Sequence, residues 1–221
     1  IKTYKMTPIY FDNAATTCVR NEVADQMALI LKSTYGNPSS THSLGRSSKT
    51  VLEQCRKRIA SHFNVKSSEI IFTSGGTEAD NLVLRSAVCD LGVQHIISSK
   101  IEHHAVSHTI AAIESTSKVM VSYVNVLKDG TVCMDHLQEL LALSNVKTLV
   151  SLMHINNEIG TILDLEYVAH LCKKYKALFH SDTVQSVGHY NLDLSLIPID
   201  FLAASAHKFH GPKGIGFAFV R

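Results

Sequence analysis

The 221 residues suffice for one large domain or two small ones, and a compact domain of this size buries about 70% of its unfolded surface. Lysine and arginine number 21 against 19 aspartates and glutamates, and the formal charge of +2 does not indicate binding to nucleic acid or to an anionic membrane. No apolar run reaches the ~20 residues that cross a bilayer, and the first residues lack a signal-peptide pattern, so we expect a protein outside the membrane.

The cysteines are odd in number, lie far apart and form no C-x-x-C pair. Neither a disulfide framework nor a zinc site is therefore indicated, and a reducing cytoplasm fits best. We expect them to be buried structural residues. They are Cys18, Cys55, Cys89, Cys133 and Cys172.

The first part of the chain predicts an arm and two helices. Residues 1–20 form the arm, of which residues 1–5 precede Met6 and are set aside as a possible remnant of cloning or processing; residues 9–11 are extended. Residues 21–35 carry apolar side chains at helical spacing behind a cap at Asn21. Residues 46–63 form a second helix, and a step of four residues places Cys55 in the core.

Short apolar runs then alternate with amphipathic ones. The predicted strands are residues 70–73, 95–98, 119–124, 148–153, 177–180, 201–204 and 214–220, and the helices between them are residues 77–91, 105–114, 135–143 and 165–175. This alternation predicts an α/β fold: a mainly parallel, seven-stranded sheet with helices on both faces. No linker divides residues 21–221, so we expect one major domain there.

The strand at 70–73 runs through two glycines into a helix. Gly76 lets the backbone approach a ligand, and the first N–H groups of the helix with the Thr77 hydroxyl can bind a phosphate. A plain capped helix start is the alternative. The stretch matches neither the dinucleotide G-x-G-x-x-G pattern nor the G-x-x-x-x-G-K-[ST] pattern, which argues against a nucleotide.

Lys208 follows another buried strand, in the stretch SAHKFHGPKGIG. A lysine amine with a lowered pKa can condense with an aldehyde cofactor such as pyridoxal phosphate (PLP), although most lysines are solvated surface charges. His103 comes after the strand at 95–98 and can stack on an aromatic cofactor or carry a proton. The alternative that the histidines bind a metal has less support, because the sequence shows no fixed spacing of metal ligands.

Three more polar residues follow strands. Asn157 could hydrogen-bond a cofactor ring or a substrate carboxylate, or serve only a turn. Asp182 is costly to bury unless it faces a cation, and a protonated pyridine nitrogen would serve; Gln185 is a nearby amide. Because α/β sheets bind ligands at the carboxyl ends of their strands, these residues together supply the parts of a PLP site.

Taken together, these stretches resemble the cysteine desulfurase and selenocysteine lyase family, within the class V aminotransferase group of PLP enzymes. The resemblance spans nearly the whole chain, in the expected order. The matching blocks are YFDNAATT from Tyr10, GNPSSTHSLGR from Gly36, FTSGGTEADN from Phe72, EHHAV from Glu102, NNEIG from Asn156, HSDTVQSVG from His180 and SAHKFHGPKGIG from Ser205.

The resemblance implies a role for each candidate residue. It implies that Lys208 holds the cofactor as a Schiff base and acts with His103 in catalysis, and that His103 stacks on the pyridine ring. The remaining implied contacts are Asp182 with the pyridine nitrogen, Gln185 with the phenolate oxygen, Gly76, Thr77, Ser205 and His207 with the phosphate, and Asn157 between cofactor and substrate.

The resemblance further implies that L-cysteine is converted to L-alanine, with sulfur passed as a persulfide to an acceptor protein, in a cytoplasmic homodimer. Family members continue beyond the equivalent of Arg221 into a small domain with the catalytic-cysteine loop, so we expect the 221 residues alone to be incomplete for turnover. Two alternatives stay open: a selenocysteine lyase or another class V lyase or transaminase, and a non-catalytic fragment that binds PLP as a scaffold.

Overall fold

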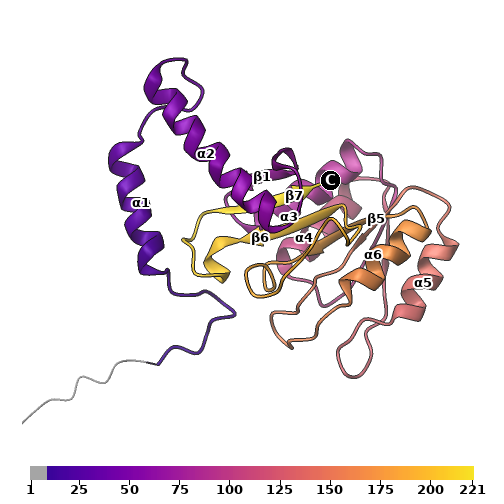
Figure 1. Cartoon of the computed structure of the whole chain (residues 1–221). Coiled ribbons are helices and arrows are strands. Elements are labelled where there is room, and N and C mark those ends of the chain that lie inside the picture. Colours follow the sequence, from indigo (N-terminus) through magenta and orange to yellow (C-terminus); the bar gives the residue numbers. More distant parts are fainter. Residues whose placement is uncertain (1–8) are drawn as a thin grey trace, which may run out of the picture.

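Seven strands form one sheet in the computed structural model, which describes residues 9–221 (Figure 1). Their order is β1-β7-β6-β5-β4-β2-β3, and only β7 runs antiparallel to its neighbours. The prediction of a mainly parallel sheet is confirmed. The strands are β1 (Ile70–Thr73), β2 (His95–Ser98), β3 (Met120–Tyr123), β4 (Thr148–Ser151), β5 (Leu178–Asp182), β6 (Phe201–Ser205) and β7 (Gly216–Val220).

Helices cover both faces of the sheet, as predicted. Neighbouring strand residues point to opposite faces, so Ile96 packs with α3 and α4 while Ile97 packs with the core that α2, α5 and α6 share. The helices are α1 (Asn21–Ser33), α2 (Ser43–His62), α3 (Gly76–Cys89), α4 (His104–Thr116), α5 (Met134–Leu143) and α6 (Leu165–Lys174), with short 3₁₀ turns η1 (Ser67–Glu69) and η2 (Ala206–Lys208).

The carboxyl ends of the parallel strands meet at one edge of the sheet. At this edge β7 enters between β1 and β6, because Gly216 pairs with both Thr73 and Ser205. A Cβ atom on Gly216 would lie 2.3 Å from the carbonyl oxygen of Ala204, so only glycine fits there. The close approach brings the start of α3 and the end of β6 together.

Strand β5 extends two residues beyond its predicted end. Ser181 and Asp182 pair with Leu202 and Ala203 of β6, and the ladder continues although these two side chains are polar. Asp182 is thus the last residue of a buried strand rather than part of the following loop.

Two expectations about α1 and α2 are wrong, and so is a third about the cysteines. Arg20, not Asn21, precedes the first turn of α1, and it makes no side-chain capping bond. Cys55 is exposed, because α2 inserts only its last turn, with Ala60, into the core. The expectation of buried cysteines also fails for Cys18 and Cys89, which are exposed; Cys133 is half-buried and Cys172 is buried.

Helix α1 has the predicted apolar spacing but buries no residue against the rest of the described chain. Figure 1 shows it apart from the sheet. The residues set aside before Met6 lie outside the described part. Within residues 9–221, no helix is both long and apolar enough to cross a membrane.

Candidate cofactor site

A cavity of about 260 Å³ opens at the carboxyl edge of the sheet, and it contains every site residue that the sequence predicted. The chain reaches it from six places: the arm, the start of α3, the loop before α4, the loop after β4, the segment at the end of β5 and the segment at the end of β6. Its lining is Ala15, Gly76, Thr77, Asp80, His103, Met153, Asn157, Asp182, Val184, Gln185, Ser205, His207 and Lys208.

One end of this cavity is built from backbone N–H groups and hydroxyls. Gly76 begins α3, and a Cβ atom there would lie 2.4 Å from Cγ2 of Val184, so glycine lets the helix start close to the next segment. Thr77 and Ser205 also line this end. Unpaired N–H groups and the helix dipole make the start of α3 suitable for an anion such as phosphate.

A carboxyl group lies at the deep side of the cavity. Asp182 is 5% exposed, and its Oδ1 accepts a hydrogen bond of 2.9 Å from the N–H of Val184. Burial raises its pKa to about 7, and the nearby Asp80 acts in the same direction, whereas the Val184 bond opposes the shift. A cationic ligand beside Asp182 would restore its charge, which fits a protonated pyridine nitrogen.

His103 precedes α4 and faces the same cavity. Its Nδ1 accepts a hydrogen bond of 3.1 Å from the N–H of Ala105, which makes it the cap of that helix. The neutral ring therefore carries its proton on Nε2. The bond fixes the imidazole at the mouth of the cavity.

The amine of Lys208 reaches the arm. Its Nζ donates a hydrogen bond to the carbonyl oxygen of Ala14, and Nε2 of Gln185 donates to the same oxygen over 2.9 Å. Partial burial lowers the pKa of Lys208, whereas Asp182 and Asp12 oppose this shift. A lowered pKa favours the uncharged amine that an aldehyde requires.

The arm is held against the turn that carries the lysine. The N–H and the hydroxyl of Thr17 each donate a hydrogen bond of 2.8 Å to the carbonyl oxygen of His207. The Thr17 hydroxyl also accepts a bond of 2.7 Å from the N–H of His210. The sequence analysis missed this role of the arm, because contacts between residues about 190 positions apart leave no local pattern.

Sequence reasoning also missed two buried titratable groups. Asp80 lies four residues after Gly76 on α3, and His180 lies two residues before Asp182 on β5. Helical and strand periodicity place each on the same side as the known residue, and this signal was present in the sequence. Asp80 is 1% exposed and His180 is fully buried.

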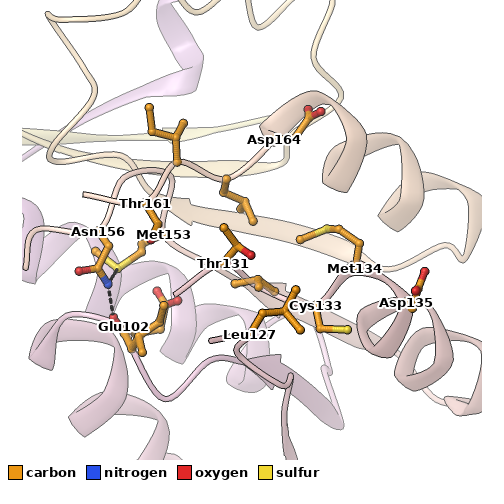
Figure 2. Close-up of a pocket in the computed structure, with 14 residues that line it drawn as sticks. Glu102, Leu127, Thr131, Cys133, Met134, Asp135, Met153, Asn156, Thr161 and Asp164 are labelled. Carbon is orange, nitrogen blue, oxygen red and sulfur yellow. Dashed lines mark hydrogen bonds between the residues drawn. The ribbon is translucent and has the colours of Figure 1, made fainter. Parts of the chain in front are cut away.

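A larger cavity of about 400 Å³ contains none of the predicted site residues (Figure 2). It shares Met153 with the smaller cavity and is lined mainly by apolar side chains. Glu102 and Asn156 are buried polar residues of this cavity. Oε1 of Glu102 accepts a hydrogen bond of 2.6 Å from the Ser99 hydroxyl, and Oε2 has no hydrogen-bond partner. Burial raises the pKa of Glu102 to about 8. All of the predicted site residues thus line the smaller cavity, which is the candidate cofactor site.

Known proteins resemble this chain in sequence over nearly its whole length. A cysteine desulfurase IscS from Dictyoglomus turgidum is 42% identical over 215 residues, which are 96% of this chain and 54% of that protein. A putative cysteine desulfurase from Bacillus subtilis is 42% identical over 218 residues, 97% of this chain and 56% of that protein. The chain thus spans about half the length of these relatives.

Solved structures resemble it as well. A NifS-like protein superposes with a TM-score of 0.92 at 37% identity, over 97% of this chain and 59% of that one. A structure of SspA in complex with cysteine gives 0.90 at 32% identity, over 96% and 61%.

The sequence also matches the class-V aminotransferases over residues 9–221. The class-V aminotransferases and cysteine desulfurases that it resembles are PLP-dependent enzymes. The chain therefore belongs to the class-V aminotransferase family.

Proposed function

We propose that this chain binds PLP in the smaller cavity and forms the cofactor-binding part of a cysteine desulfurase. The observation that carries the proposal is the convergence of Lys208, Asp182 and the start of α3 on one cavity. An amine, a buried carboxyl in need of a cation and an anion site match the aldehyde, the pyridine nitrogen and the phosphate of one molecule. Gly76 supports the fit, because a side chain there would collide with Val184.

Each of the predicted site residues then has a role. Lys208 would hold the cofactor through its amine, and the free amine would move the proton at the substrate α-carbon. Asp182 keeps the pyridine nitrogen protonated, and PLP in that state stabilises negative charge at the same carbon. The other residues bind and orient: His103 stacks on the ring, Gln185 contacts the phenolate oxygen, Asn157 lies between cofactor and substrate, and Gly76, Thr77, Ser205 and His207 hold the phosphate.

The substrate that we propose is L-cysteine, which becomes L-alanine while its sulfur leaves as a persulfide. The named relatives are cysteine desulfurases, and one similar structure is described as a complex with cysteine. A selenocysteine lyase or another class V lyase or transaminase would bind the cofactor with the same residues. Product analysis with cysteine and selenocysteine distinguishes these reactions.

None of the five cysteines lines the smaller cavity. We therefore propose that residues 21–221 form a PLP-binding large domain and that none of these five cysteines is the one that accepts the sulfur. The corresponding whole protein would be a cytoplasmic homodimer that passes sulfur to an acceptor protein, as in iron–sulfur cluster assembly. One relative of 40% identity is mitosomal, so the compartment varies among related proteins.

Covalent labelling tests the cofactor site. The chain is incubated with PLP, reduced with borohydride, digested and examined by mass spectrometry. We expect one PLP on the peptide that contains Lys208, and no label in Lys208→Ala. The matched control is Lys213→Ala, which removes an exposed lysine of the same turn region and should keep the label. A folded chain without label, or a Lys208→Ala variant with undiminished label, would overturn the proposal.

A further inference from the structure

Three titratable side chains lie together under the cofactor cavity. Asp80 comes from α3, and His180 and Asp182 come from the same face of β5; all three are at most 5% exposed. Asp80 and Asp182 both line the cavity. The function proposed above uses Asp182 but gives no task to Asp80 or His180.

The His180 ring lies between α3 and β4. Its Nε2 is 3.2 Å from Oδ1 of Asp80, and neither atom has another hydrogen-bond partner. Its Nδ1 is 2.9 Å from Oγ of Ser151, which is also buried. Both ring nitrogens thus face a single side chain each, and one proton between Asp80 and His180 satisfies both orphaned atoms.

Charge balance decides where the negative charge sits. Two neighbouring carboxylates cannot both ionise cheaply in a buried site, and burial raises the pKa of Asp80 well above its usual value. Asp182 accepts a hydrogen bond from the N–H of Val184, which favours the charged carboxylate. The nearby His103 favours the charged form of Asp182 as well. Burial lowers the pKa of His180 to about 4, so its ring is neutral near pH 7.

The other charged groups around this cluster point to the same distribution. Burial, with smaller effects of Asp182 and Asp80, raises the pKa of Glu102 to about 8, so this group, which precedes α4, is neutral near pH 7 and adds no charge to the cluster. Lys208 from the turn after β6 attracts charge to Asp182. Among the residues that the structure describes, the basic side chains that line the cavity are His103, His207 and Lys208.

We propose that Asp80 is a positioning residue that stays protonated and donates its O–H to Nε2 of His180, so that Asp182 rather than Asp80 carries the negative charge of the cavity. His180 then holds its own proton on Nδ1 and donates it to Ser151. This inference rests on the proposed PLP site, because Asp182 serves the pyridine nitrogen only there.

The first experiment needs no cofactor. The ¹⁵N shifts of His180 are measured in the chain as isolated, and the signal is assigned by its loss in His180→Asn. We expect the Nδ1–H tautomer in the wild type and in Asp80→Asn, because an amide N–H also donates to Nε2. In Asp80→Ala this preference should disappear. A wild-type ring protonated on Nε2, or one that changes tautomer in Asp80→Asn, would show that Asp80 is ionised and overturn the proposal.

The second experiment follows PLP binding and the pH titration of the bound cofactor by absorbance. Asp80→Asn should keep the wild-type affinity within about twofold and the titration midpoint within about 0.3 pH units. Asp80→Ala should weaken PLP binding by about tenfold, because it leaves Nε2 of His180 without a partner at the buried side of the cavity. A shift of more than about one pH unit in both variants, or wild-type behaviour of Asp80→Ala, would refute the role. If the wild type fails to bind PLP, the cofactor proposal fails instead, and the histidine tautomer still reports on Asp80.

Discussion

Lys208 and Gln185 share one acceptor, the carbonyl oxygen of Ala14, although these residues lie far apart in the sequence. The arm therefore occupies part of the space where an aldehyde cofactor would meet the amine. A bound cofactor must compete with this carbonyl for the lysine. At the scale of single residues, the site is thus held together before any ligand enters.

Glu102 makes the stability of the chain depend on pH. Its pKa is about 8 in the folded state and ~4.3 when unfolded, so between these values the native chain keeps a proton that the unfolded chain has lost. Stability must therefore fall as pH rises through this window. Two buried histidines, His154 and His180, have a lowered pKa of about 4 and act in the opposite direction, but only below about pH 6.5.

We therefore predict that the free energy of unfolding falls between about pH 6.5 and pH 8, by at most ~1.4 kcal/mol per pH unit for this proton. Glu102→Gln should make the slope shallower, as urea unfolding at several pH values would show, while Asp80 and Asp182, whose pKa values burial also raises, keep part of it. The control is Glu139→Gln, which changes an exposed glutamate and should leave the slope unchanged. An unchanged slope in Glu102→Gln would exclude Glu102 as its source.

At the scale of elements, the arm depends on one hydroxyl. Thr17 donates to His207 and accepts from His210, and it is 8% exposed. Thr17→Ala should reduce the free energy of unfolding by about 1–3 kcal/mol and weaken PLP binding, because the arm then loosens over Lys208. The exposed Thr50→Ala on α2 is the control, and PLP affinity together with urea unfolding is the measurement. If Thr17→Ala binds PLP with wild-type affinity, the attachment of the arm does not affect the cofactor site.

Helices α1 and α3 have similar apolar spacing but different surroundings. Leu84 on α3 is fully buried, whereas Leu31 on α1 is 75% exposed. Leu84→Ala should cost about 2–5 kcal/mol of unfolding free energy, and Leu31→Ala less than about 0.5 kcal/mol. Chemical denaturation of the two variants in parallel provides the measurement. A similar loss in both would mean that α1 is covered in solution.

At the scale of the whole molecule, the proposed cofactor site and the cysteines of the chain lie apart, because no cysteine lines the smaller cavity. Since none of the five cysteines lines the smaller cavity, we predict that the 221-residue chain binds PLP but releases no alanine from cysteine. An alanine assay and mass spectrometry for a persulfide would check this. Sustained alanine production would show that one of these cysteines reaches the site.

The sequence by itself determined the fold class and most of the site. Strand and helix periodicity depends on local side-chain patterning, so the seven strands and the two helical layers could be predicted from it. Most candidate site residues could also be named, since they lie at or just after strand ends and the carboxyl ends of parallel strands share one edge, whereas Ser205 and His207 were named only from the family resemblance. Element ends were less certain, because the pairing of Ser181 and Asp182 with β6 depends on a neighbour remote in sequence.

Only the tertiary structure decided which apolar patterns become core and which polar groups meet. The same spacing is buried in α3 and exposed in α1, and Cys55 is exposed because α2 packs only by its last turn. The contacts of Ala14 with Lys208 and of Asp80 with His180 join segments about 100 or more residues apart. Burial and distance set the charge of such groups, and neither is a property of a residue's position in the sequence.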